Sequence, residues 1–246
     1  MIAIIDYGMA NLRSVERALA HAGGSPVITS DPEEIRRAER VVLPGVGAFC
    51  ACMSNLNARG LNDAVLEAIG EGKPFLGICV GLQMLFDSST EMGTTPGLAI
   101  LPGKVVRFFE QDAASNRHPG NAGQSTIGIR QSETITSHKP QATSHKPQTS
   151  CQLPANLKVP HIGWNALEFP RRTNLFRDVE HQARVYFVHS YYPVPSDPSV
   201  IAAVSDYGEV FCAAVERENV AATQFHPEKS GAVGQRILRN FLDWKP

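Results

Sequence analysis

Five residues near position 79 have the pattern of a site for nucleophilic chemistry. Residues 77–81 read Gly-Ile-Cys-Val-Gly, which is a nucleophile elbow with cysteine in place of serine. This turn between a strand and a helix brings the flanking residues close together, so that small residues such as Gly77 and Gly81 are needed there. The helix start favours the thiolate, which is the attacking species. We therefore predict that Cys79 is a nucleophile, the alternative being a buried structural cysteine in a tight turn.

A cysteine nucleophile needs a base that is itself held in place. His226 and Glu228 flank Pro227, which restrains the preceding residue to extended geometry. Residues two apart in an extended chain point the same way, so we expect the Glu228 carboxylate to orient the imidazole. Alone this motif is more typical of a surface turn, but together with the elbow it predicts a Cys-His-Glu triad. His189 is the one other histidine that competes for the role of base.

Attack on a carbonyl group also requires donors for the oxyanion. The backbone N–H of Val80, directly after the nucleophile, is the first candidate. The second is the glycine loop formed by Gly45, Val46 and Gly47, which follows a predicted strand and so opens at the same sheet edge as Cys79. The alternative, a phosphate cradle, lacks the Lys and Ser/Thr that such loops carry. We expect this loop to contribute to the oxyanion hole.

The remaining cysteines do not form a recognisable metal or disulfide pattern. The five cysteines are at positions 50, 52, 79, 151 and 212. An odd number in a chain of this length does not indicate a disulfide scaffold. The Cys50-x-Cys52 pair is not followed by a second pair at zinc-site spacing. We therefore expect neither a metal nor a cofactor.

The elements that must position these residues alternate between strand and helix in the first half of the chain. Apolar runs predict strands at 3–6, 27–29, 41–44 and 75–79. Helical spacing predicts helices over 12–22 and around 61–69, and a further helix at 81–86. Such alternation implies right-handed βαβ units and an α/β fold with a mostly parallel central sheet flanked by helices.

The second half is richer in strands. Residues 185–192, 201–204, 210–215 and 220–225 are all β-like, and Glu218-Asn219 suits a turn between the last two of these runs. Apolar residues from Val233 to Trp244 share one face of a closing helix. We expect one domain spanning 1–246.

One polar segment, 110–158, interrupts this pattern. It is rich in Ser, Thr, Gln, Asn and Pro and repeats SHKPQ at 137–141 and 144–148. Such a segment cannot bury enough apolar area to offset its ordering entropy, so we expect a mobile surface insertion. The alternative for its repeated histidines is a metal-binding tract.

Composition excludes several classes of protein. Of 246 residues, 43% are hydrophobic and 19% charged, which excludes global disorder, and the net charge of -1 is unlike a nucleic-acid binder. No run approaches the roughly 18 apolar residues that a membrane span needs. We also find no signal peptide, and expect a cytoplasmic protein without nucleic-acid or membrane partners.

Taken together, the segments GICVGLQ, PGVGAF and FHPE resemble the class I (triad) glutamine amidotransferases, whose fold is flavodoxin-like. The resemblance implies that Cys79 attacks the carboxamide of L-glutamine to form a glutamyl thioester. It implies that His226 is the general acid and base and that Glu228 orients it. By the same resemblance, Gln83 and the backbone at Ser190 and Tyr191 would hold the substrate glutamine.

Four further segments narrow the resemblance. IIDYGMANLRSV, PHIGWN, YFVHSYY and FHPEKS look like the glutaminase subunits of imidazole glycerol phosphate synthase. This resemblance implies a heterodimer with a (β/α)8-barrel cyclase, which receives the ammonia and makes imidazole glycerol phosphate and an aminoimidazole carboxamide ribotide for histidine biosynthesis. Asn11, Trp164 and Lys229 are the candidates for the docking face, although Trp164 could equally be a core residue.

The resemblance also suggests how activity could be switched. If the amide of the 45–47 loop points away from the site at rest, the oxyanion hole is incomplete, and a peptide rotation favoured by the partner would complete it. An alternative is a class I glutaminase that serves another acceptor, of the anthranilate synthase or pyridoxal phosphate synthase type. A non-catalytic domain on the same fold is disfavoured because Cys79 and His226 are both present.

Overall fold

The computed structural model describes residues 1–109 and 157–246. Of the predicted insertion at 110–158, only Leu157 and Lys158 belong to the described residues, so its predicted mobility lies outside them. Within the two described ranges, no helix is long and apolar enough to cross a membrane.

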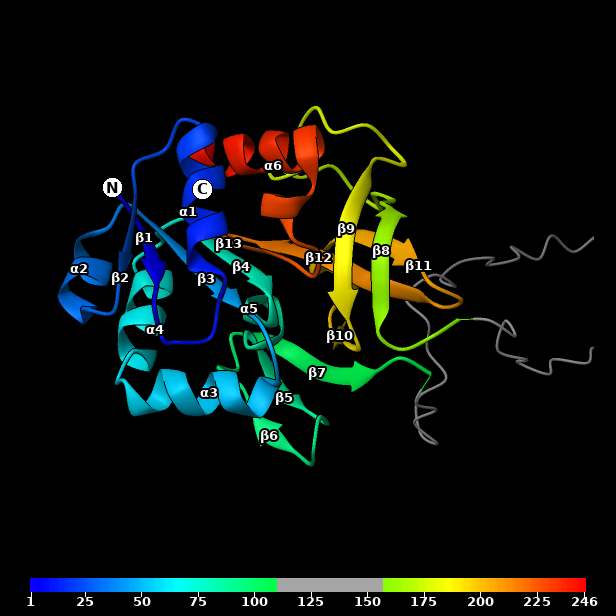
Figure 1. The fold of residues 1–246 in the computed structure, drawn as a ribbon, viewed down its shortest axis with the longest axis horizontal. Coiled ribbons are helices and arrows are strands. Elements are labelled where there is room, and N and C mark those ends of the chain that lie inside the picture. The colour runs from blue at the N-terminus through cyan, green and yellow to red at the C-terminus, as the bar shows by residue number, and fades with distance from the viewer. Residues whose placement is uncertain (110–156) are drawn as a thin grey trace, which may run out of the picture.

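A seven-stranded sheet forms the centre of the molecule (Figure 1). Its strand order is β11-β12-β13-β4-β3-β1-β2, and the five strands from β13 to β2 are parallel, while β12 and β11 are antiparallel additions. The bounds of its strands are β1 (Ile2–Ile5), β2 (Pro26–Thr29), β3 (Arg40–Gly45), β4 (Phe75–Cys79), β11 (Ile201–Asp206), β12 (Val210–Arg217) and β13 (Val220–Thr223). This arrangement confirms the predicted α/β class with a mostly parallel sheet.

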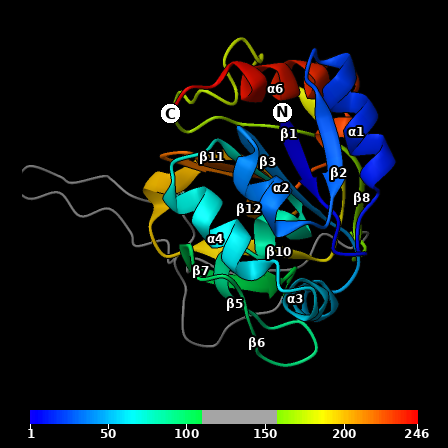
Figure 2. The same ribbon diagram turned by 90° about the vertical axis from the view of Figure 1, so that its left-hand side faces the viewer.

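Helices cover both faces of this sheet. The first and last helices pack side by side on one face, and α2 and α4 lie together on the other (Figures 1 and 2). The helices are α1 (Leu12–His21), α2 (Pro32–Arg37), α3 (Phe49–Ala58), α4 (Asn62–Gly70), α5 (Val80–Gln83) and α6 (Gly231–Asp243), with short 3-10 helices η1 (Pro198–Val200) and η2 (Pro227–Lys229). The helices predicted from apolar spacing at 12–22 and 61–69, and the closing helix, are confirmed.

Two smaller sheets lie beside the central one. The order of the four-stranded sheet is β10-β7-β5-β6, and β8 pairs with β9 in an antiparallel ribbon. Their bounds are β5 (Phe86–Ser89), β6 (Thr95–Pro96), β7 (Leu101–Arg107), β8 (His161–Ala166), β9 (Arg184–His189) and β10 (Tyr191–Pro195). The single strand predicted at 185–192 is therefore two strands that belong to different sheets and meet at Ser190.

The helix predicted at 81–86 is wrong in its extent. Helix α5 ends at Gln83, and Phe86 already begins β5. The carbonyls of Met84 and Leu85 accept hydrogen bonds from the backbone N–H groups of residues 98, 100 and 101. Because these carbonyls pair with a distant segment, the chain leaves the helix after one turn.

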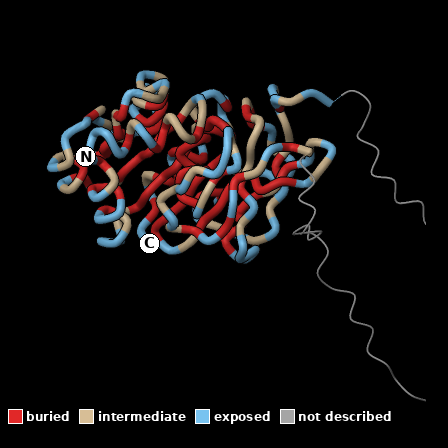
Figure 3. Tube along the Cα trace, turned by 90° about the horizontal axis from the view of Figure 1, so that it is seen from below, coloured by how far each residue is buried: buried red, intermediate tan, exposed pale blue. Residues whose placement is uncertain are grey.

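The core is continuous between the central sheet and its helices, and the buried chain runs through the middle of the molecule (Figure 3). The strands β1 and β4 are buried at every position. This is expected for parallel strands covered on both faces.

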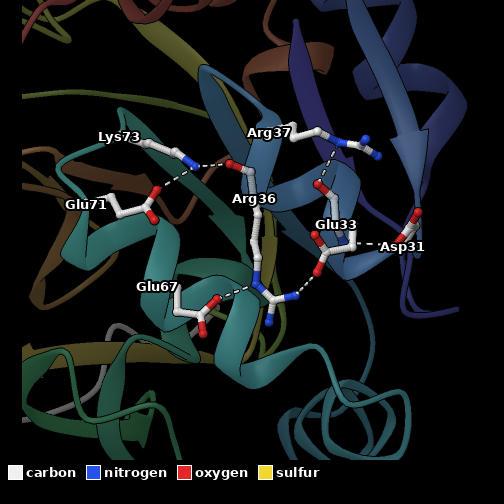
Figure 4. Close-up of polar contacts among 7 residues, drawn as sticks. All are labelled: Asp31, Glu33, Arg36, Arg37, Glu67, Glu71 and Lys73. Carbon is white, nitrogen blue, oxygen red and sulfur yellow. Dashed lines mark hydrogen bonds and ion pairs between the residues drawn. The ribbon is translucent and has the colours of Figure 1, made fainter.

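Ion pairs connect two helices at the surface (Figure 4). Arg36 on α2 contacts Glu33 of the same helix and Glu67 of α4, and Lys73 binds Glu71. The Arg36–Glu67 ion pair therefore joins α2 to α4.

Candidate active site

Cys79 occupies the turn between β4 and α5. Its backbone has φ 56° and ψ −112°, a conformation that L residues rarely adopt and that marks a strained functional turn. A Cβ atom at Gly77 would come within 2.8 Å of the Gly81 carbonyl oxygen, and a Cβ at Gly81 would collide with the Leu43 carbonyl. Both glycines are therefore required by close backbone approach, as the sequence predicted.

His226 and Glu228 form the hydrogen bond that was predicted for them. Nδ1 of His226 lies 2.7 Å from Oε1 of Glu228, and both side chains are buried. The predicted route to this contact is wrong, because Glu228 lies in the one-turn helix η2 rather than in an extended strand. His226 itself is extended, and the chain turns only at Pro227.

The protonation of His226 is controlled by opposing effects. Burial lowers the pKa of His226, but its interactions with the Cys79 thiol and the Glu228 carboxylate outweigh this effect and raise the pKa to about 10. Among the described residues, Nε2 of His226 has no hydrogen bond of ordinary geometry. With Nδ1 engaged by Glu228, Nε2 is the nitrogen available to exchange a proton with the thiol.

Two glutamines connect the nucleophile to the neighbouring sheet. Nε2 of Gln224 lies 3.7 Å from Sγ of Cys79, and Oε1 of Gln224 accepts a hydrogen bond from Gln83. Gln83 also donates to the carbonyl oxygen of Tyr191 at 2.9 Å. Gln83, Tyr191 and Cys79 are thus brought together. Gln224 was not among the predicted site residues, although its place two residues before His226 and directly after β13 was a usable signal.

The predicted oxyanion donors differ in availability. Val80 is the first residue of α5, where backbone N–H groups have no partner within the helix. The N–H of Val46 instead donates to the carbonyl oxygen of Met9 at 3.1 Å. The described loop therefore does not offer the Val46 amide to the site. Gly47, with φ +89°, provides the backbone freedom that the loop needs.

Two side chains bind carbonyl groups of this loop. The hydroxyl of Tyr7 donates to the Pro44 carbonyl at 2.8 Å, and Sγ of Cys52 lies 3.4 Å from the Val46 carbonyl oxygen. Burial raises the pKa of the Cys52 thiol to about 11, so this cysteine is a neutral hydrogen-bond donor.

In the described part of the chain, no group of three or more His, Cys, Asp and Glu side chains could hold a metal ion.

A cavity of about 290 Å³ opens beside Cys79. Of the three predicted loop residues, Val46 and Gly47 line it and Gly45 does not. The other lining residues include the predicted Gln83, Ser190 and Tyr191, and also Glu91 and Lys229. Glu91, which the sequence analysis missed, accepts a hydrogen bond from the Phe49 N–H at 2.6 Å and so caps the start of α3. No sequence pattern marks this carboxylate, because its position results from the packing of the 90–93 turn against α3.

The mouth of the cavity adjoins an exposed surface of the β8–β9 ribbon. Pro160, Val188 and Lys229 are among the residues that line the cavity, and Ile162 and Trp164 on β8 are 59% and 49% exposed. Trp164 is therefore not a core residue. Asn11 is exposed at the start of α1 and makes no side-chain capping bond.

Known proteins resemble this chain along its whole length. The family model described as "Glutamine amidotransferase class-I" matches residues 3–244. The chain is 47% identical over 244 residues to the imidazole glycerol phosphate synthase subunit HisH of Geobacter sulfurreducens, covering 99% of each protein. It is 41% identical over 241 residues to the HisH subunit of Salinibacter ruber, covering 98% of this chain and 93% of that protein.

Solved structures resemble the fold at lower identity. A crystal structure of a glutamine amidotransferase superposes with a TM-score of 0.62 at 16% identity, covering 99% of this chain and 98% of the other. PurLQS from Thermotoga maritima gives a TM-score of 0.61 at 18% identity, covering 98% and 97%.

Proposed function

Because the chain belongs to the class I glutamine amidotransferases and, among them, to the HisH subunits of imidazole glycerol phosphate synthase, we propose that it hydrolyses L-glutamine at Cys79 and delivers the ammonia to a partner subunit. The observation that carries this proposal is that Cys79 and His226 line one cavity while Glu228 holds the imidazole of His226. In this function the chain serves histidine biosynthesis.

The first half of the reaction forms a thioester. The thiol proton passes from Cys79 to Nε2 of His226, and the sulfur attacks the carboxamide carbon of glutamine. The tetrahedral intermediate collapses when His226 returns the proton to the leaving nitrogen, which departs as ammonia. Glu228 holds the imidazole through Nδ1 in both steps. Water, deprotonated by the same histidine, then hydrolyses the thioester to glutamate.

The cavity suits the ends of the glutamine molecule. The backbone at Ser190 and Tyr191 lines the cavity, and Gln83 lies beside it. The carboxylate of Glu91 is a suitable partner for the α-ammonium group, since it is the acidic side chain that lines the cavity together with Cys79 and His226. No cofactor is needed for this chemistry.

The oxyanion hole is the proposed point of control. The N–H of Val80 can meet the developing negative charge, whereas the N–H of Val46 is bonded to Met9. Rotation of the Gly45–Val46 peptide would turn this amide toward the thioester site. We therefore expect low activity for the chain alone and higher activity when a liganded partner favours the rotated loop.

The proposed partner is a (β/α)8-barrel cyclase that docks over the cavity mouth as a heterodimer. Ammonia must stay unprotonated and away from bulk water to remain a nucleophile, which requires the two sites to be joined. The exposed side chains of Ile162 and Trp164 lie on β8, and Lys229 lies over the ring of Tyr186 at 5.8 Å. Trp164 packs edge-on against the same ring. Asn11 completes the proposed docking face.

The test is glutamate release from glutamine, measured for the chain alone and with a cyclase subunit and its nucleotide ligand. A Cys79→Ala variant is the control in both conditions. Weak activity that rises strongly with the liganded partner and is lost in Cys79→Ala is the expected result. High activity without any response to this partner would retain the triad but reject the synthase assignment. A folded chain with no activity in either condition would reject both.

A further inference from the structure

Two buried histidines outside the triad face each other across the β8–β9 ribbon. His161 and His189 are register partners and are 3% and 6% exposed. Nδ1 of His161 lies 3.1 Å from Nε2 of His189. His189 also lines the cavity beside Cys79. The mechanism above gives neither residue a role.

Asn165, His161, His189 and the Tyr191 carbonyl form a series of hydrogen bonds, and the direction of each bond follows from the last acceptor in this series. Nδ1 of His189 lies 3.0 Å from the carbonyl oxygen of Tyr191, which can only accept, so this nitrogen carries the proton. In a neutral ring Nε2 of His189 must then accept, and Nδ1 of His161 must donate to it. Nε2 of His161 is left as an acceptor for the amide of Asn165 at 3.4 Å.

Burial keeps both rings neutral. It lowers the pKa of His161 to about 4 and that of His189 to about 3. Near neutral pH each ring therefore has one donor and one acceptor, and the series from Asn165 to Tyr191 has a single arrangement of protons. If either ring adopted its other neutral tautomer, one of its nitrogens would be an acceptor that lies opposite another acceptor atom.

The orientation of His161 is fixed on every side. Its ring stacks on Tyr207 at 4.0 Å and on Phe187 at 4.8 Å, each with an interplanar angle of 23°. Asn165, which binds its Nε2, is itself held by a 2.7 Å hydrogen bond to the carbonyl oxygen of Asp206. His161 is therefore well placed to determine how His189 is oriented.

The series ends at a carbonyl in the proposed glutamine subsite. The Tyr191 carbonyl accepts from His189 on one side and from Gln83 on the other. Two donors fix the direction of the Tyr191 carbonyl, directly after Ser190. Both residues line the cavity.

We infer that His161 is a positioning residue for glutamine binding, which acts by fixing His189 and, through it, the Tyr191 carbonyl. This inference rests on the proposed function, since the ligand it invokes is glutamine. Among the described residues, the hydrogen bonds of His161 go to His189 and Asn165 and to none of the triad residues, so the effect belongs to binding rather than to the chemical step. The expected signature is a change in KM with kcat preserved.

Two substitutions of similar polarity separate this role from simple packing. In His161→Asn the side-chain amide lies where Nδ1 lay and can still donate to His189. In His161→Gln the amide reaches the position of Nε2 and leaves His189 without a donor. Glutamate release with the liganded partner gives kcat and KM, and the rate of Cys79 alkylation by iodoacetamide reports the triad without glutamine.

His161→Gln is expected to raise KM roughly five- to tenfold, the size of one lost net hydrogen bond, with kcat within about twofold and the alkylation rate unchanged. For the His161→Asn variant we expect a KM near that of the wild type, because its amide can still donate to His189. Asn165→Ala, a half-buried position, tests the same series if His161→Gln does not fold, with an expected two- to threefold rise in KM.

Three results would overturn the inference. One is an unchanged KM in His161→Gln or, where that variant does not fold, in Asn165→Ala. Another is an equal rise in KM for the Asn and Gln variants, and the third is a fall in kcat and alkylation rate together with the change in KM. A wild-type chain that releases no glutamate with its liganded partner identifies the separate failure of the proposed function, and the inference falls with it.

Discussion

At the scale of single residues, the site depends on how the imidazole of His226 is held. One oxygen of Glu228 binds Nδ1, and Nε2 is buried. The pKa of His226 is raised despite burial because both of its neighbours, Cys79 and Glu228, favour the charged ring. The proposed base is therefore able to keep the proton that it takes from the thiol until the leaving group needs it.

Glu228→Gln tests this arrangement. The substitution preserves shape but removes the charge that stabilises the imidazolium, so we expect kcat for glutamate release to fall about 10²- to 10³-fold. The measurement is turnover at saturating glutamine with the liganded partner. Glu39→Gln is the control, since the Glu39 side chain is 80% exposed and, within the described ranges, binds the N-terminus alone. A kcat within threefold of the wild type would contradict the proposed role of Glu228.

The two neutral histidines predict how stability depends on pH. The pKa values of His161 and His189 are lowered from 6.5 in the unfolded chain to about 4 and about 3. Below pH 6.5 the two histidines bind more protons in the unfolded chain than in the folded chain. Their contribution to the free energy of unfolding is therefore fully present above pH 6.5 and is lost as the pH falls toward the folded pKa values. Each histidine contributes a slope of about 1.4 kcal/mol per pH unit.

Urea unfolding between pH 7 and pH 4.5 measures this slope. A His161→Phe variant, which retains an aromatic ring but cannot be protonated, should lose about half of it. His226 acts in the opposite direction: its raised pKa contributes stability below pH 6.5 that is lost as pH rises toward 10. An acid slope identical in His161→Phe and in the wild type would contradict the assignment.

At the scale of elements, the elbow depends on the close approach of β3, β4 and α5. A Cβ atom on Gly81 would meet the backbone carbonyl of Leu43, which cannot move without distorting β3. We expect Gly81→Ala to destabilise the fold by about 3 kcal/mol or more. Gly70→Ala is the matched control, because nothing lies within 4 Å of its Cβ position at the end of α4. Denaturant midpoints of the two variants compare them directly.

Equal midpoints for Gly81→Ala and Gly70→Ala would show that the elbow tolerates a side chain. The control itself is expected to be neutral or slightly stabilising, since alanine limits the unfolded chain more than glycine does. The strained φ of Cys79 is therefore maintained by the neighbouring backbone rather than by local preference.

The sequence predicted best those features that depend on local pattern. The parallel strands, helices α1, α4 and α6, the elbow and the His226–Glu228 pair all follow from periodicity or from residues close in the chain. Helices α2 and α3 were not predicted. The short strands β5 and β6 and the one-turn helix α5 did not, because their limits depend on hydrogen bonds to distant segments such as residues 98–101. Hydrophobic periodicity does not identify segments of two to four residues reliably, because they contain too few positions to show a repeat.

The same reason explains what was missed in the site. Gln224 and Glu91 lie near Cys79 only after strands and turns have packed. The bond between Val46 and Met9 joins the end of β3 to the turn after β1. A motif can indicate that a loop supplies an amide, but the direction of that amide depends on the tertiary fold.

At the scale of the whole molecule, the cavity and the proposed docking face are neighbours along the β8–β9 ribbon, because Val188 lines the cavity and pairs with the exposed Ile162. Trp164 is half-exposed there and contacts Tyr186, whose ring also lies beneath Lys229. Half-exposed aromatic groups at the centre of an interface often dominate binding energy. This surface therefore gives a direct test of the proposed heterodimer.

Trp164→Ala should weaken binding to the cyclase subunit about 30-fold, while glutamate release by the chain alone stays unchanged. Calorimetric titration measures the affinity. Val27→Ala is the control, since Val27 is also partly exposed but lies on β2 at the opposite edge of the central sheet (Figure 1). An unaltered Kd in Trp164→Ala would place the docking face elsewhere.

The bond from the Val46 N–H to the Met9 carbonyl has a consequence for the amounts of the two subunits in a cell. A single backbone hydrogen bond contributes about 0.5–1.5 kcal/mol net, so the rotated loop is populated in on the order of one free chain in ten rather than in none. Every unpartnered copy would then consume glutamine slowly and release ammonia that no acceptor captures. Production of the two subunits in matched numbers is the condition that limits this nitrogen loss.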